Sequence, residues 1–323
     1  MTVATHLRPV IDGPSWLIGP SPDLTELGPN ADGSPPHHEC VDHHIFQDAS
    51  GVWQLWGCIR RTSVGRILYR WEADRLTDSP WRQTGEIIRV DPAAGESLND
   101  RHGEEWIQSP FVVKERGQYF MFYGGHGTGA DASGRPVERD DPRVACQMCL
   151  MTSPDGRQWT RHRDARGYSR LFVGPGETRD PCLLRVGGLW YLYHAGYHND
   201  AREEAGFYAR TSRDLLHWSD WTLVHQDPAY GAGPWNTECP HVVYRAGSFY
   251  LFRTVDYASA TSHVFRSDDP LDFGVGDASG KYVRPIAVAA PEIIVDDRGQ
   301  EYITSNHDLL GGARIARLRW EAV

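Results

Sequence analysis

The chain has 323 residues, of which 40% are hydrophobic and 11% aromatic, and its formal net charge is -10 at pH 7. This composition can fill a large buried core and does not fit a disordered chain. The negative charge disfavours nucleic acid as a partner, because a basic surface supplies most of the affinity for a phosphate backbone.

The N-terminus lacks a cationic start followed by a long apolar segment, and no stretch elsewhere approaches 18 apolar residues. We therefore expect a cytoplasmic protein that does not bind a membrane. Residues 1–36 are rich in Pro and Gly, which predicts an extended lead-in that wraps the first unit of the fold. Residues 37–323 are predicted to form a single domain, since closed all-β folds often use this much chain.

One sequence pattern occurs five times in residues 37–323. A strand start marked by an acidic residue or proline leads into a short apolar run, a glycine turn and an aromatic-rich strand. Each copy predicts two β-strands joined by a tight turn. The turn glycines recur about 50 to 70 residues apart, a spacing that suits one propeller blade per repeat. They are Gly51, Gly117, Gly188, Gly247 and Gly299.

Five similar hairpins predict five similar sheets. An isolated hairpin is only marginally stable, whereas four-stranded sheets arranged radially around a channel leave only short edges unprotected. The predicted fold class is therefore all-β, a five-bladed β-propeller. Residues 313–321 alternate between apolar and polar side chains, so we expect them to form the strand that closes the fifth blade.

Acidic residues stand at the start of three of these hairpins. Asp42 and Glu238 lie nine residues before the turn glycine of their repeat, and Asp180 lies eight before it. Ser109 and Ala290 occupy the matching places in the second and fifth copies. The inner strands of a propeller run along its channel, so equivalent positions converge, and three carboxylates are predicted to share one pocket.

Carboxylates that share a pocket resist simultaneous ionisation, so their clustering favours a chemical role over three separate strand caps. Glycoside hydrolysis uses such a set: one carboxylic acid protonates the leaving oxygen, and a carboxylate attacks the anomeric carbon or activates water. The alternative for any single acid is a solvated turn or strand cap. The alternative for the whole site is a non-catalytic carbohydrate-binding propeller.

Two proline triplets carry a resemblance to a known group of enzymes. Arg179-Asp180-Pro181 and Glu238-Cys239-Pro240 are similar to the RDP and ECP motifs of family 32 glycoside hydrolases. Over about residues 38 to 320, the chain resembles the five-bladed propeller glycosidases of families 32, 43 and 68. The resemblance implies that Asp180 stabilises the oxocarbenium-like transition state. It also implies that Glu238 is the general acid/base and that Asp42 is the nucleophile or the general base.

The chain also departs from the family 32 pattern. That family carries Asn-Asp-Pro-Asn-Gly around its nucleophile, whereas this chain has Cys40-Val-Asp42-His-His, and a propeller without a C-terminal β-sandwich is more typical of family 43. We therefore expect a glycosidase that acts on a small, furanosidic substrate such as a fructofuranoside or arabinofuranoside, free or within an oligosaccharide. A transglycosylase or a phosphorolytic relative that uses the same acids is a further alternative.

Residues beside the three acids are expected to bind the sugar. Trp106 and Trp235 are predicted to stack on a sugar ring, with core packing as the alternative for each. Arg179 is predicted to contact a carboxylate or hydroxyl group, with a structural salt bridge as its alternative. The same rim is expected to include His44, Ser109 and His126.

The sequence predicts no required cofactor. The resemblance to family 43 implies that His307 lies near the axis of the channel, beside a structural calcium ion or a water cluster. Such an ion would be structural and would take no part in the reaction.

Overall fold

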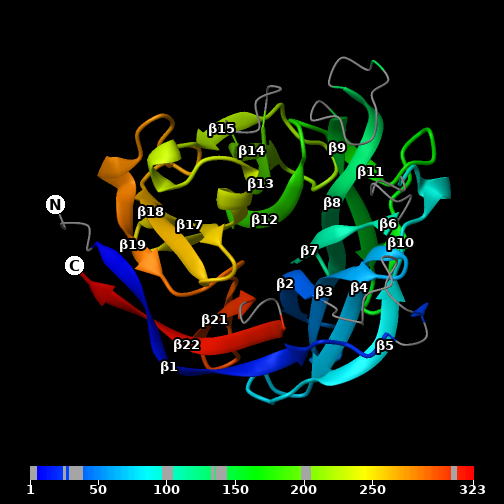
Figure 1. Cartoon of the computed structure of the whole chain (residues 1–323), viewed down its shortest axis with the longest axis horizontal. Coiled ribbons are helices and arrows are strands. Elements are labelled where there is room, and N and C mark those ends of the chain that lie inside the picture. Colours follow the sequence, from blue (N-terminus) through cyan, green and yellow to red (C-terminus); the bar gives the residue numbers. More distant parts are fainter. Residues whose placement is uncertain are drawn as a thin grey trace.

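The computed structural model describes residues 6–24, 27–28, 39–96, 105–131, 135, 144–197, 205–306 and 311–323. Five sheets stand around a central axis, each with a main row of four antiparallel strands, which follow one another along the chain in four of the sheets (Figure 1). This arrangement confirms the predicted five-bladed β-propeller.

The first two blades each carry one extra strand. In the first blade, β6 (Glu105–Trp106) pairs in parallel with β4, and in the second, β11 (Arg170–Val173) pairs with β9. The four main strands of the first blade are, from the axis outward, β2 (Glu39–Gln47), β3 (Trp53–Thr62), β4 (Gly65–Ala73) and β5 (Arg82–Ile88). Those of the second blade are β7 (Gln108–Glu115), β8 (Gln118–Asp131), β9 (Val144–Ser153) and β10 (Thr160–Arg161).

The third and fourth blades are simple four-stranded meanders. The strands of the third blade are, from the axis outward, β12 (Arg179–Val186), β13 (Leu189–Gly196), β14 (Gly206–Ser212) and β15 (Thr222–His225). Those of the fourth are β16 (Glu238–Arg245), β17 (Ser248–Asp256), β18 (Thr261–Ser267) and β19 (Tyr282–Ile286).

The fifth blade joins the two ends of the chain and differs from the sequence prediction. Its strand order is β20 (Ile293–Val295), β21 (Glu301–Asn306), β22 (Gly312–Ala322) and β1 (Leu7–Pro20). The segment predicted as a lead-in around the first blade is therefore the outer strand of the fifth, paired with β22 from Leu7 and Ala322 onward. β1 also contacts the first blade, where the Trp81 amide donates to the Ile18 carbonyl at 2.8 Å, but its strand pairing belongs to the fifth blade.

The helices among the described residues are single 3-10 turns, and none of them could span a membrane. They are η2 (Pro92–Ala94), η4 (Pro228–Tyr230), η5 (Pro234–Asn236) and η6 (Ser279–Lys281).

The five turn glycines named above have the conformation that the sequence predicts. Their φ angles lie between 79° and 89°, a region that side-chain-bearing residues rarely adopt. A Cβ atom at any of them would meet nothing within 4 Å, so it is the backbone angle and not crowding that favours glycine. In three hairpins the residue before the glycine also has positive φ, as a two-residue type I′ loop requires: Arg116, Gly187 and Ala246.

The core lies between neighbouring blades. The aromatic strands that follow each glycine turn supply much of it, because β-branched and aromatic side chains fill the space between pleated sheets. Trp56 and Tyr123 pack between the first two blades, and Tyr250 and Ile303 pack between the last two. This packing fixes the inner strands, which carry the candidate site.

Candidate active site

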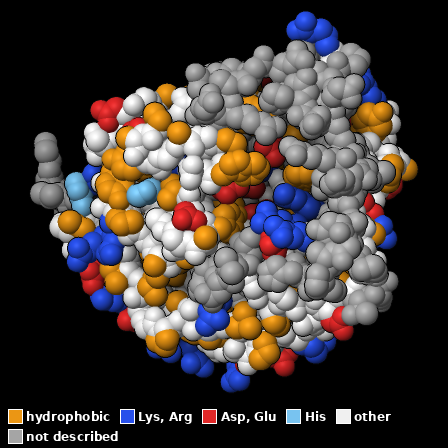
Figure 2. Space-filling view, viewed as in Figure 1, with side chains coloured by type: hydrophobic (Ala, Val, Ile, Leu, Met, Phe, Trp, Pro, Cys, Tyr) orange, Lys and Arg blue, Asp and Glu red, His pale blue; other side chains and the backbone are white. Residues whose placement is uncertain are grey.

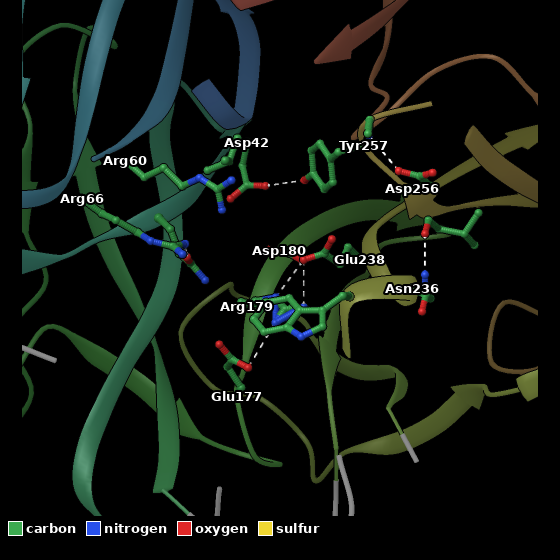
Figure 3. Close-up of a pocket in the computed structure, with 15 residues that line it drawn as sticks. Asp42, Arg60, Arg66, Glu177, Arg179, Asp180, Asn236, Glu238, Asp256 and Tyr257 are labelled. Atoms are coloured by element: carbon green, nitrogen blue, oxygen red, sulfur yellow. Dashed lines mark hydrogen bonds and ion pairs between the residues drawn. The ribbon is translucent and has the colours of Figure 1, made fainter. Parts of the chain in front are cut away.

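The three predicted carboxylates line one pocket at one mouth of the channel. The pocket has a volume of about 400 Å³, and Asp42, Asp180 and Glu238 all contribute to its wall (Figure 3). Figure 2 shows acidic and basic side chains gathered in the hollow at the centre of this face. The acids come from β2, β12 and β16, which are the inner strands of three different blades.

A repeated backbone kink aims these residues into the pocket. In the four later blades, the residue before the inner-strand proline has a left-handed φ between 46° and 57°. The ladder of β7, β12 and β16 shifts register at the same place, because proline cannot donate a ladder hydrogen bond. The residues concerned are Ser109, Asp180, Cys239 and Ala290.

The kink separates two rings of side chains. The residues just before it line the upper pocket: Gln108, Arg179 and Glu238. The kink residues, with Asp180 in both rings, line the narrower space below. Glu238 is therefore the structural counterpart of Arg179, and Cys239 is the counterpart of Asp180. The sequence pattern predicts that Glu238 matches Asp180, which is one position off.

Ser109 links two of the acids. Its hydroxyl oxygen lies 2.9 Å from Oδ2 of Asp42 and 2.8 Å from Oδ1 of Asp180, and all three side chains are buried. A hydroxyl can donate only one hydrogen at a time. The two carboxylates therefore compete for one proton donor, or one of them is protonated and donates to the hydroxyl.

Arg179 links the other pair. Its Nε donates to Oδ2 of Asp180 at 3.3 Å, and its Nη2 donates to Oε1 of Glu238 at 3.2 Å. Its Nη1 also lies 3.3 Å from a carboxylate oxygen of Glu177. Arg179 therefore forms structural salt bridges, which the sequence analysis gave as the alternative to sugar binding. Its side chain also lines the pocket.

The second oxygen of Asp42 faces two further donors. The Tyr257 hydroxyl lies 3.0 Å from Oδ1 of Asp42, and the Cys239 thiol lies 3.3 Å from the same atom. Tyr257 follows β17, so the fourth blade reaches across the pocket to orient an acid of the first. Asp42 is held at both oxygens, which fixes the direction of its carboxylate.

Burial separates the protonation behaviour of the acids. It raises the pKa of the Glu238 carboxyl to about 8, against the opposing effect of the Arg179 guanidinium and with added repulsion from Asp180. Burial also raises the pKa of Asp180 to about 6, again opposed by Arg179. Glu238 is therefore the group that holds a proton at neutral pH.

The other predicted rim residues fall into different surroundings. Trp235 lines the pocket with 62% of its surface exposed, and the Arg179 guanidinium lies 5.7 Å from its ring centroid. Trp106 is not part of the pocket lining: the Arg66 guanidinium covers its ring at 4.2 Å, and its indole N–H donates to Gln108. Trp106 thus supports a pocket residue instead of facing the pocket itself.

The histidine predictions have different outcomes. His44 is buried below the site, where its ring nitrogens bond Glu292 at 2.8 Å and the Val112 carbonyl at 2.9 Å. The expectation that His44 contacts a sugar is wrong, because both of its polar atoms are occupied by the protein. The side chain of His126, on β8, and all of His307 lie outside the described residues.

A second cavity, of about 30 Å³, continues below the acids along the channel. Calcium takes six to eight oxygen ligands. The carboxylates that reach this space, Asp42, Asp180 and Glu292, already accept hydrogen bonds from Ser109, Tyr257, His44 and the backbone. A structural calcium ion in the channel stays a prediction, because His307, on which it was based, lies outside the described residues.

Among the described residues, one group of possible metal ligands clusters: Asp42, Asp180 and Cys239, with ligand atoms within 4.8 Å of one another. Burial raises the pKa of the Cys239 thiol well above its usual value. In the structure these groups bond one another: the Cys239 thiol lies 3.3 Å from Oδ1 of Asp42, and the Cys239 amide donates to Oδ2 of Asp180 at 3.1 Å.

Sequence reasoning missed several residues of the pocket. Gln108 and Cys239 were within reach, because Gln108-Ser109-Pro110 repeats the pattern of the RDP and ECP triplets. Tyr257 lies beyond the repeated hairpin and carries no comparable signal. Arg60 and Arg66, beside the turn that joins β3 to β4, also line the pocket without a motif to mark them.

Comparison with the sequences of known proteins does not assign the chain to a family. No protein family model matches the chain. An uncharacterized protein of Mycobacterium tuberculosis is 34% identical over 94 residues, which are 29% of this chain and 28% of that protein. The match therefore spans less than a third of either protein.

Comparison with solved structures is more informative. A thermostable family-43 glycoside hydrolase superposes with a TM-score of 0.60 at 16% identity, over 88% of this chain and 90% of that one. An exo-1,5-α-L-arabinanase from a bovine ruminal metagenomic library superposes with a TM-score of 0.58 at 14% identity, over 86% of this chain and 92% of that one. A family 32 β-fructofuranosidase of Bombyx mori superposes with a TM-score of 0.56 at 14% identity, over 88% of this chain and 61% of that one. The chain therefore shares the five-bladed propeller fold of family 43 and family 32 glycoside hydrolases.

Proposed function

We propose that this protein is a glycoside hydrolase that cleaves a small furanosidic substrate. The observation that carries the proposal is the pairing of a carboxyl that keeps its proton at neutral pH with a rigidly held carboxylate across one pocket. Glu238 is the first of these groups and Asp42 is the second. Glycoside hydrolysis needs one carboxylic acid and one carboxylate on the two sides of the scissile bond.

Each acid has a definite task in this reaction. Glu238 gives its proton to the oxygen that leaves the anomeric carbon. Asp42 either attacks that carbon, forming a glycosyl ester that water then cleaves, or takes a proton from the water that attacks it. Asp180, held by Ser109, Arg179 and the Cys239 amide, faces the positive charge that develops on the ring. The products are two sugars, or a sugar and an alcohol, with one water consumed.

The fold neighbours support the choice of substrate class. The solved structures that share the fold include an α-L-arabinofuranosidase and a β-fructofuranosidase, whose names specify furanosidic sugars, and an exo-1,5-α-L-arabinanase. Other neighbours are a xylan β-1,4-xylosidase and a family 43 enzyme in complex with xylotriose, so pyranosides belong in the same test.

A panel of nitrophenyl furanosides and pyranosides tests the proposal. We expect release of nitrophenol from at least one furanoside, without phosphate and without a sugar acceptor. Cleavage only with added phosphate would indicate phosphorolysis, and transfer to an acceptor would indicate a transglycosylase. Saturable sugar binding without any release would indicate a carbohydrate-binding propeller.

The activity should fall on the alkaline side with a midpoint near the pKa of Glu238. The general acid must be protonated in the free enzyme, and its protonated fraction falls as pH rises through about 8. The kcat/KM for a substrate with a poor leaving group, measured from about pH 5 to about pH 10, should therefore decline above that value. An alkaline limb that persists unchanged in Glu238→Gln would assign the titration to another group.

A further inference from the structure

One wall of the pocket carries positive charge that the carboxylate chemistry does not use. Arg60 on β3 and Arg66 on β4 both line the pocket, and both lie on the first blade, on the Asp42 side (Figure 3). Arg179, by contrast, lies on the third blade and is engaged by Asp180, Glu238 and Glu177. The two arginines of the first blade thus form a separate group.

Arg66 is held in place without being neutralised. Its Nη1 donates to Oε1 of Gln108, a side chain that is only 1% exposed, and its flat face covers the Trp106 ring at 4.2 Å. It forms no ion pair with a carboxylate within the described part of the chain. A guanidinium has five N–H donors, and a neutral amide oxygen takes up only one of them.

Arg60 adds a second, partly exposed guanidinium. Its Nε bonds the buried Glu39 carboxylate, and 34% of its side chain is exposed. Glu39 also bonds the neighbouring Arg61 at 3.2 Å, so one carboxylate serves two arginines. Glu39 therefore does not neutralise both Arg60 and Arg61, and Asp42 is the one other described acid of the first blade that lines this wall.

The geometry points to a substrate that carries an anionic group. We propose that Arg66, assisted by Arg60, binds a carboxylate or phosphate ester on the sugar, next to the bond that the acids cleave. A fixed guanidinium fork matches such a group with two parallel hydrogen bonds, and the Trp106 ring below it preserves the orientation. A neutral sugar would leave the positive charge of Arg66 uncompensated. The inference rests on the proposed function, since it names the substrate class of the same site.

Binding measurements on matched sugars test this inference without depending on turnover. Calorimetry would compare fructose 6-phosphate with fructose, arabinose 5-phosphate with arabinose, and glucuronate with glucose, and inorganic phosphate would be titrated alone. We expect at least one acidic sugar to bind at least tenfold more tightly than its neutral twin. Arg66→Gln should lower the affinity for that acidic sugar at least tenfold and change the affinity for the neutral twin less than twofold.

Arg61→Gln is the matched control, because Arg61 neighbours Arg60 and bonds the same Glu39 but is 59% exposed and does not line the pocket. Because it removes no guanidinium that lines the pocket, it should change either affinity less than twofold, even though Glu39 then bonds Arg60 alone. If Arg66→Gln does not fold, Arg66→Lys keeps the charge and loses the fork, and it should weaken the acidic sugar alone. Equal affinity for the twins, or an acidic preference that survives both Arg66 variants, would overturn the inference.

The remaining outcomes are also decisive. If inorganic phosphate binds as tightly as the sugar phosphates, the site binds a free anion, and the inference that the anionic group is part of the sugar substrate is wrong. Failure of every acidic sugar to bind also overturns the inference. An acidic preference without cleavage of any glycoside would keep the anion site and remove the hydrolase proposal, so the two failures are distinguishable.

Discussion

Glu238→Gln is expected to abolish the turnover of substrates with poor leaving groups, while activated aryl glycosides retain much of theirs. Only the former need a proton on the leaving oxygen, and a positioned general acid contributes roughly 10²–10⁴-fold to such a step. The amide oxygen of Gln can still accept the bond that Arg179 donates to Glu238 at 3.2 Å. The pocket should therefore keep its shape, and the loss should report chemistry.

The comparison of leaving groups isolates the role of Glu238. The ratio of kcat/KM for an aryl glycoside to that for an alkyl glycoside should rise at least hundredfold in Glu238→Gln. Glu177→Gln is the matched variant, because Glu177 lies on the same guanidinium at 3.3 Å. Any loss it causes should be equal for both substrates. An equal loss in Glu238→Gln as well would remove Glu238 from the acid role.

Asp180→Asn is expected to lower kcat by several orders of magnitude, with substrate affinity within roughly tenfold of the original. The carboxylate matters most when positive charge develops on the ring, so its removal weakens the transition state more than the ground state. Asn tolerates the left-handed φ of 57° that Asp180 adopts, so the backbone kink should survive.

The stability of the same variant separates catalysis from structure. Asp180 accepts hydrogen bonds from Ser109, Arg179 and the Cys239 amide. An amide nitrogen in place of Oδ2 would face two donors, whereas in place of Oδ1 it can donate to the Ser109 hydroxyl. The cost in the free energy of unfolding should therefore not exceed about 1–3 kcal/mol. The Tm, the Kd and kcat should be measured on one preparation. A destabilised variant with its full kcat would show that Asp180 is a structural residue.

The fold was predictable because its signals are local and repeated. The second turn position of these hairpins has a φ of 82° to 89°, which favours glycine whatever surrounds it, so Gly117 and Gly247 reveal their hairpins from sequence alone. The outer strand of the fifth blade was missed because its pairing joins residues about 300 positions apart, such as Arg8 and Glu321. Such a pairing leaves no local mark on either segment.

The site was predictable only where it follows the repeat. Asp42, Asp180 and Glu238 stand at the starts of inner strands, which a propeller must bring together. The role of Ser109 as a bridge between two carboxylates depends on a kink before proline, and that kink became visible only in the backbone angles. Tyr257 and Arg66 come from other strands or turns, so only tertiary packing places them at the pocket.

The central claim is that the carboxylates of this pocket cooperate to cleave a glycosidic bond. The most direct test follows one oligosaccharide substrate by ¹H NMR with the wild-type protein and with Asp42→Asn. We expect new reducing-end signals with the wild type and a rate at least about a thousandfold lower with a folded Asp42→Asn protein. Equal rates for the two proteins would contradict it.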